Sequence, residues 1–296
     1  MPFLSKLGTQ LGVFVLWLIH FLPLKWIGAI GAALGSVIYL FGRGRVTRIN
    51  LALCFPEMSE RERHELGRRH FRMLGRNAVE LGVMVWGTEK QLLRLVRVEG
   101  AEHLKAAAGK RPIIVLAPHF IGLNMAGTRL AYEYPGTASI YSRQKNPVLD
   151  RIFMRARTRF GEPHLVSRQE GLRSVIRVVK SGKPFYFLPD MDFGLRDAIF
   201  SPFFGVPAAT ITTLPRLAKL TGAAVIPVVT RQVGDGYVVR FYPEWKDYPT
   251  GDVEADVRRM NAFIEDRVRE MPEQYFWAHK RFKTRPPGEP SPYKRK

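Results

Sequence analysis

The chain has 296 residues, 46% of them hydrophobic and 24% charged, which excludes a disordered chain and allows two domains at most or one large α/β domain. Its single cysteine, Cys54, excludes a disulfide framework and any zinc site built on cysteines. A net charge of +20 predicts polyanionic partners, such as nucleic acid, an anionic membrane, a phosphorylated substrate or an acidic protein.

Residues 1–45 are predicted to anchor the chain in a membrane. The stretch 11–42 is mostly apolar, exceeds the roughly 20 residues that span a bilayer, and precedes the first acidic residue, Glu57. It is too long for a signal peptide. Pro23 and Lys25 divide it into two helical pieces, and the arginines that follow it favour a cytoplasmic location for the rest of the chain: Arg43, Arg45 and Arg48. The alternatives left open are a buried pair of core helices, one membrane span or a shallow hairpin.

Residues 46–95 are predicted to form a basic amphipathic helical segment. Ser59 and Glu62 have the spacing of a capping box, which marks the start of a helix. Apolar residues recur at helical spacing from Leu66 to Val85, and four arginines lie on another face: Arg68, Arg69, Arg72 and Arg76. These arginines either form a solvated face or lie against anionic lipid.

Residues 96–285 alternate between short apolar runs and helical patterns, which predicts an α/β fold with a largely parallel mixed sheet flanked by helices. The expected strands are residues 113–117, 138–141, 185–188, 224–229 and 237–241, and the expected helices are residues 123–132, 147–159, 171–181, 213–221 and 253–271. Residues 286–296 form a basic, proline-rich tail.

Polar side chains follow three of the predicted strands. His119 follows the first, Arg143 and Lys145 follow the second, and Asp190 and Asp192 follow the third. Ligands of open α/β sheets bind at the carboxyl ends of the strands. A histidine, a basic pair and two carboxylates at one edge would suit the activation of a hydroxyl beside an anion-holding patch.

Several other functions are disfavoured by missing motifs. The sequence has no G-x-S-x-G, P-loop or G-x-G-x-x-G pattern, which argues against a serine hydrolase and against nucleotide cofactors. Its seven histidines are never spaced at i,i+4, so a catalytic metal is disfavoured. No helix-turn-helix, RNP or zinc-finger pattern supports nucleic acid as the partner. We therefore expect no metal and no cofactor.

The segment from His119 to Asn124 resembles the H-x(4)-[DE] block of the glycerolipid and lysophospholipid acyltransferase superfamily. An ordered set of further stretches is similar to the lipid A late acyltransferases of Gram-negative bacteria. These stretches are residues 50–51, 55–57, 117–120, 141–147, 188–194, 200–205, 272–277 and 279–283. The resemblance covers nearly the whole chain.

The resemblance implies transfer of a fatty acyl chain from an acyl carrier protein thioester to a hydroxyl of a 3-hydroxyacyl chain on a lipid A precursor. It implies an inner-membrane enzyme with its catalytic domain on the cytoplasmic face, and His119 as a general base without a covalent intermediate. Arg143 and Lys145 would hold phosphate or carboxylate groups, while Asp190 and Asp192 would orient substrate or structure their loop. Aromatic residues near 200–206 would line an acyl pocket or belong to the core.

Asn124 departs from the family pattern, which has an acidic residue at this position. Three interpretations stay open: asparagine suffices, another acid such as Asp190 or Asp192 replaces the carboxylate, or the chain is a weak or altered paralogue. Two other functions also stay open. They are acyl transfer to another membrane lipid, such as a lysophospholipid, and a non-catalytic lipid-binding membrane protein that kept the fold.

Overall fold

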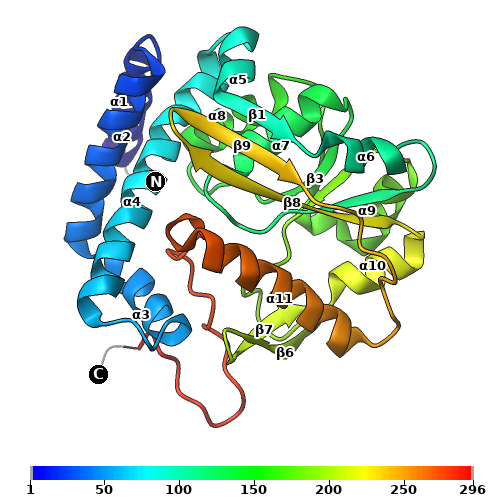
Figure 1. Ribbon diagram of the computed structural model, residues 1–296. Coiled ribbons are helices and arrows are strands. Elements are labelled where there is room, and N and C mark those ends of the chain that lie inside the picture. The colour runs from blue at the N-terminus through cyan, green and yellow to red at the C-terminus, as the bar shows by residue number, and fades with distance from the viewer. Residues whose placement is uncertain (1–2, 295–296) are drawn as a thin grey trace.

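A mixed seven-stranded sheet lies at the centre of the computed structural model, which describes residues 3–294 (Figure 1). The strand order is β1-β9-β8-β2-β5-β3-β4, and every neighbouring pair is parallel except β8 and β9. The strands are β1 (Val96–Glu99), β2 (Ile113–Leu116), β3 (Ala138–Tyr141), β4 (His164–Ser167), β5 (Phe185–Phe187), β8 (Ala224–Val233) and β9 (Gly236–Phe241). The predicted fold class is confirmed.

The central strands are buried on both faces. Along β2, Ile114 and Leu116 belong to one apolar cluster, whereas Ile113 and Val115 belong to the other. Side chains alternate between the faces of a strand, and helices cover both faces of a parallel sheet, so such strands read as continuous apolar runs. The edge strands β1 and β4 are not continuous apolar runs, because half of the residues in each are polar and at least partly exposed. The sequence analysis therefore did not predict these two strands.

The five helices predicted beside the strands are present, together with Glu89–Leu95, which ends the predicted helical segment 46–95, and Ala101–Ala107, which the sequence did not predict. They are α5 (Glu89–Leu95), α6 (Ala101–Ala107), α7 (Leu123–Glu133), α8 (Pro147–Thr158), α9 (Gly171–Lys180), α10 (Thr213–Thr221) and α11 (Val253–Glu270), with a 3₁₀ turn at Pro272–Gln274. The side chain of Asn146 caps α8 by accepting the backbone N–H groups of Val148 and Leu149, and Pro147 occupies the first turn.

The aromatic run near residue 200 forms a β-hairpin of β6 (Ala198–Phe203) and β7 (Val206–Ile211). Phe203 is fully buried and packs against the rings of Tyr275 and Phe282. None of the residues suggested for an acyl pocket, Phe200, Phe203, Phe204 and Val206, lines the large cavity described below. Phe203 is therefore a core residue.

The amino-terminal apolar run folds into two helices, as the sequence predicted. α1 (Phe3–Ile19) and α2 (Leu24–Ile38) are separated at Pro23, and a π-helical turn at Tyr39–Arg43 leads into α3 (Gly44–Cys54). One helix of the described chain, Leu24–Phe41, is long and apolar enough to cross a membrane, with 18 residues and a mean hydropathy of 1.6.

α2 packs along α4 (Glu60–Trp86), the long helix beside it at the left of Figure 1. Glycines allow this approach, because a Cβ at Gly31 would lie 2.5 Å from the Cα of Arg76. The capping box of Ser59 and Glu62 begins α4 as predicted. Arg76 does not belong to the predicted basic face, because its side chain points inward and its Nε donates to the buried Glu80 at 2.7 Å.

Apolar side chains on α1 and α2 remain exposed on the face opposite α4. Trp26 and Phe21 are 63% and 67% exposed, and Phe41, in the turn after α2, is 82% exposed. The others are Leu7, Leu11, Phe14, Val15, Trp17, Leu18, Leu22, Leu34, Val37, Ile38 and Leu40. A continuous apolar surface of this size is unusual for a protein surrounded by water and marks an interaction site.

The carboxyl-terminal tail is tied to the body as far as the described residues extend. Tyr293 is buried, its hydroxyl donates to the amide oxygen of Asn50, and it also accepts the backbone N–H of Phe282 at 3.1 Å. The last two residues of the predicted tail, Arg295 and Lys296, lie outside the described part of the chain.

Candidate active site

His119 lies at the carboxyl end of the sheet, three residues beyond the end of β2. Asp190 lies three residues beyond the end of the neighbouring β5, and the register pairs the last residues of these strands, Leu116 and Phe187. Equal offsets from paired residues bring the two side chains together. The sequence predicted the edge at which they meet, and the strand order supplies the pairing.

The His119 ring is held by Asp190. Its Nδ1 lies 2.6 Å from Asp190 Oδ1, and the backbone N–H of His119 donates to Asp190 Oδ2 at 2.9 Å. Because a carboxylate accepts, Nδ1 carries the proton and Nε2 is left with its lone pair. The side chain of His119 is 15% exposed and that of Asp190 only 1%.

Asp190 remains ionised despite its burial. Burial alone would raise the pKa of its carboxyl group, but the electrostatic interaction with His119, the two hydrogen bonds from that residue and the charge of Arg281 outweigh burial and hold that pKa below its usual range. Arg281 is itself fully buried and donates to the Ala209 carbonyl and to Thr210 Oγ1 at 2.8 and 2.7 Å. The histidine therefore faces a charged carboxylate.

The segment after α11 clamps the loop that carries His119. The backbone N–H of Phe276 donates to the His119 carbonyl at 2.9 Å, and the N–H of Ile121 donates to the Gln274 carbonyl at 2.8 Å. The Gln274 side chain accepts the N–H of Gln232 at 2.6 Å and donates to its carbonyl at 3.2 Å. These bonds fix the histidine backbone from a region about 150 residues further along the chain.

The loop requires a glycine at position 122, where φ is +91°. A Cβ there would also lie 2.6 Å from the ring of Tyr237. Only glycine adopts this conformation without strain, and the residue begins α7 directly after the His119 loop.

Asp192 organises the same edge but does not contact His119. Its carboxylate accepts the backbone N–H and the hydroxyl of Thr284 at 2.6 and 2.8 Å, and its own N–H donates to His279 Nε2 at 3.0 Å. Burial, helped by the neighbouring charges of His119 and Arg281, lowers the pKa of His279 to about 4. A neutral His279 is consistent with Nε2 acting as an acceptor.

A cavity of about 570 Å³ opens beside His119. Apolar and small residues form much of its lining, among them Leu123, Gly127, Ile140, Leu165, Val175 and Leu188. A cavity of this size with a few convergent polar groups is typical of a small-molecule or acyl-chain site. No cluster of three or more metal-binding side chains occurs within residues 3–294.

Asn124 lines this cavity but is not the hydrogen-bond partner of His119. Its Oδ1 accepts from Nε and Nη2 of Arg157 at 3.3 and 3.0 Å. Of the three interpretations of Asn124, the geometry favours replacement by another acid, Asp190, since that residue holds the imidazole.

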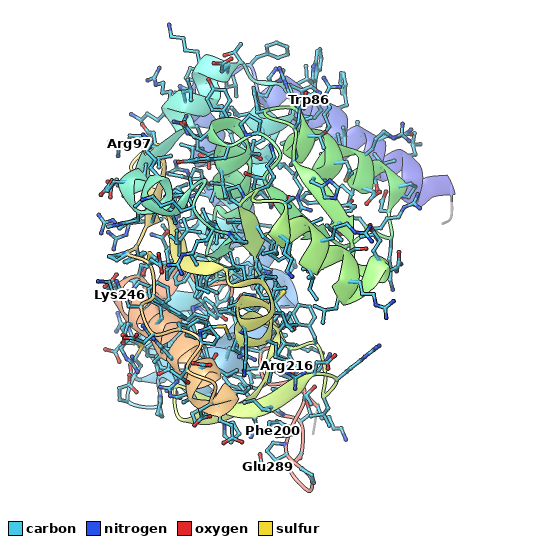
Figure 2. All side chains as sticks on the ribbon, turned by 90° about the vertical axis from the view of Figure 1, so that its right-hand side faces the viewer. Trp86, Arg97, Phe200, Arg216, Lys246 and Glu289 are labelled. Atoms are coloured by element: carbon cyan, nitrogen blue, oxygen red, sulfur yellow. The ribbon has the colours of Figure 1, made fainter. Side chains whose placement is uncertain are left out.

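The predicted basic pair lies outside the cavity lining. Arg143 and Lys145 are exposed, and the side chain of Arg143, 84% exposed, lies 3.6 Å from Asp150. The cavity is instead lined by the cations Arg157, Arg196 and Arg216. Arg216 lies on the face that points away from α1 and α2 (Figure 2).

No sequence pattern singled out these three arginines. Arg157 is one of several arginines on its helix, and only the rotation of α8 distinguishes it from its exposed neighbours Arg151 and Arg155. Arg196 directly precedes Asp197 and pairs with it at 3.9 Å, and Arg216 reaches the same carboxylate at 3.6 Å.

Comparison with known proteins identifies relatives over the whole fold. Residues 2–284 match the bacterial lipid A biosynthesis acyltransferase family. A lipid A biosynthesis lauroyltransferase of Escherichia coli (strain K12) is 35% identical over 96% of this chain and 94% of its own length. The palmitoleoyltransferase of the same organism is 34% identical over 96% and 94%, and its myristoyltransferase is 32% identical over 98% and 91%.

Proposed function

Because this chain belongs to the bacterial lipid A biosynthesis acyltransferase family, we propose that it moves a fatty acyl chain from an acyl carrier protein thioester to a hydroxyl of a 3-hydroxyacyl chain on a lipid A precursor. The observation that carries the proposal is the His119–Asp190 pair at the wall of a largely apolar cavity. Acyl transfer needs such a base and a space for an acyl chain.

In the proposed mechanism, Nε2 of His119 accepts the proton of the acceptor hydroxyl as that oxygen attacks the thioester carbonyl. The tetrahedral intermediate then collapses, the carbon–sulfur bond breaks, and the departing thiolate takes the proton from Nε2. Asp190 keeps the proton on Nδ1 and stabilises the imidazolium that forms between the two steps. No covalent enzyme intermediate is required.

The charges of the molecule support the proposed partners. The acyl carrier protein, the phosphates of the acceptor and the membrane are all acidic, and the chain carries a net charge of +20. Asp192 has a positioning role in this proposal, because its hydrogen bonds fix the loop beside Asp190.

We further propose that residues 1–45 anchor the chain in the inner membrane and that residues 96–285 carry out the transfer on its cytoplasmic face. Exposed apolar side chains on α1 and α2 support insertion, and the exposed arginines of α4 support contact with anionic lipid headgroups: Arg68, Arg69 and Arg72. In this scheme residues 46–95 lie beside the membrane, and residues 286–296 cover the body as a basic tail.

The test supplies the purified full-length protein with an acyl carrier protein thioester and either a lipid A precursor or a lysophospholipid. A mass gain of one acyl chain on the lipid A precursor supports the proposal. Transfer to the lysophospholipid alone would assign another acceptor, and lipid binding without transfer would indicate a non-catalytic protein.

The membrane proposal has a separate test. The protein should stay with the membrane fraction in 1 M salt, where the Debye length is about 3 Å and attachment by charge alone is screened. Release by salt would contradict insertion of α1 and α2.

A further inference from the structure

Arg157 projects from α8 into the cavity with part of its guanidinium unused. Nε and Nη2 donate to Asn124 Oδ1, and the guanidinium carbon lies 5.2 Å from the centre of the Tyr141 ring. Nη1 has no hydrogen-bond partner within residues 3–294, and it is not among their buried unsatisfied atoms. Arg157 lines the cavity, and the two N–H groups of Nη1 have no partner there among the described residues.

The charge of Arg157 has no direct counter-charge. The other basic side chains of the lining each face a carboxylate: His119 faces Asp190, and both Arg196 and Arg216 face Asp197. Within the described chain, no carboxylate lies within ion-pair distance of Arg157. The acceptor that orients it is a neutral amide.

The nearest acid that influences Arg157 is already engaged. Asp150 accepts the hydroxyl of Tyr141 and the backbone N–H of Gln144, and Arg143 lies 3.6 Å from it. Burial lowers the pKa of Arg157, because removing water from around the guanidinium disfavours its charged form. Arg157 is partly buried and lacks a counter-charge, so an anionic ligand in the cavity would supply the charge that the protein does not.

We propose that Arg157, held in place by Asn124, binds a phosphate group of one of the two substrates. The planar fork of an arginine matches the geometry of phosphate oxygens. Asn124 orients the guanidinium group without neutralising its charge, whereas a carboxylate at position 124 would form an ion pair with it. The proposal rests on the proposed function for its two phosphate sources: the lipid A precursor and the pantetheine arm of the carrier protein.

The site itself is tested with inorganic phosphate and the full-length protein in detergent. Phosphate at about ten times its Kd should raise the Tm of the parent by about 2 °C, relative to chloride at equal ionic strength. Arg157→Gln should abolish this rise. Asn124→Asp should also abolish it while raising the Tm in phosphate-free buffer, because the new carboxylate pairs with Arg157.

The matched control is Arg151→Gln, an exposed arginine on the same helix, which should respond to phosphate as the parent does. A phosphate response that survives in Arg157→Gln, or an equal loss in Arg151→Gln, overturns the proposal. This experiment needs no acyl transfer, so its result is independent of whether the proposed function holds.

The source of the phosphate is found from kinetics with matched substrates. One arm compares the lipid A precursor with its dephosphorylated form, and the other compares the carrier thioester with a pantetheine thioester that lacks phosphate. Arg157→Gln should raise KM about 10- to 100-fold for the phosphorylated member of one pair, as expected for a lost charged hydrogen bond, and leave the other member unchanged. A fall in kcat with every substrate at constant KM overturns the proposal, because the charge would then act in the transition state.

Discussion

Two walls of the same cavity hold their polar groups in opposite ways. The strand wall, formed by His119 and Asp190, sets a neutral imidazole against an ionised carboxylate at the ends of adjacent strands. The helix wall, formed by Asn124 and Arg157, joins a charged guanidinium to a neutral amide across α7 and α8. Both pairs are fixed by hydrogen bonds, but the strand wall contains a carboxylate, whereas the helix wall contains only a cation and a neutral amide.

The difference separates two tasks. A histidine–carboxylate pair can accept a proton and release it again, since the carboxylate stabilises the imidazolium until the histidine returns to its neutral form. An arginine keeps its proton at all physiological pH values, so the helix wall can attract or position a substrate but cannot transfer protons. The predictions below disturb these walls and their supports, from the largest expected effect to the smallest.

Asp190→Asn should cause the largest loss, because it removes the charge of the strand wall and changes which ring nitrogen of His119 carries the proton. We expect kcat to fall by up to about 10⁴-fold, the size of the corresponding change in a serine protease triad. The measurement is the initial rate of acyl transfer beside the unfolding midpoint. Asp197→Asn, a carboxylate of the same cavity that contacts no histidine, should keep most of the activity.

Gln274→Ala should weaken the clamp behind the strand wall. The change removes two buried hydrogen bonds and leaves the N–H of Gln232 without a partner, which should cost about 2–4 kcal/mol of unfolding free energy. Gln274→Glu keeps the acceptor but places a buried carboxylate oxygen against the Gln232 carbonyl, so this variant should also be less stable than the parent. Equal stability of all three proteins in denaturant titrations would contradict the clamp.

The buried histidines should make the fold sensitive to acid. Burial lowers the pKa of His70 to about 4, as it does for His279, whereas an unfolded histidine titrates near 6.5. As the pH falls from 6.5 to 4, these histidines become protonated in the unfolded chain but stay neutral in the folded chain. The unfolding free energy should therefore fall by about 1 kcal/mol per pH unit for each histidine.

The His70 contribution can be isolated with His70→Asn, whose amide can still donate to the Glu273 carbonyl that His70 Nδ1 contacts at 3.0 Å. The slope of unfolding free energy against pH should be shallower in this variant between pH 6.5 and 4. A slope identical to that of the parent would show that His70 does not contribute.

Arg143→Gln and Lys145→Gln should have the smallest effects. Both residues are exposed and lie outside the cavity lining, and exposed charges in water interact weakly with distant groups. We expect KM for the phosphorylated acceptor to change by less than about threefold. A larger change would show that the anion binds at the loop between β3 and α8 and not at the helix wall.

The sequence predicted the parts of the molecule that follow from local patterns. Buried apolar runs identified β2, β3, β5 and β8, and the capping box of Ser59 located the start of α4. The placement of His119 and Asp190 at one edge followed from their positions after two of these strands. Which acid faces His119 did not follow, because it depends on β5 lying next to β2.

Features that depend on rotation and long-range packing were not predictable. Arg157 faces the cavity, Arg155 donates to the Val85 carbonyl of α4 and Arg151 is exposed, a distinction set by how α8 packs. The segment 272–277 is recognisable as a motif, yet its bonds to the His119 loop are visible only in three dimensions. The basic face of α4 was also overestimated, because Arg76 pairs with a buried glutamate.

The central claim is that Nε2 of His119 accepts the proton of the acceptor hydroxyl. It is tested most directly by following acyl transfer to the lipid A precursor by mass, with the parent and with His119→Ala of matched unfolding midpoint. The account predicts a loss of about 10²- to 10⁴-fold in the variant, partly restored by added imidazole. Near-parental transfer by the folded variant would contradict it.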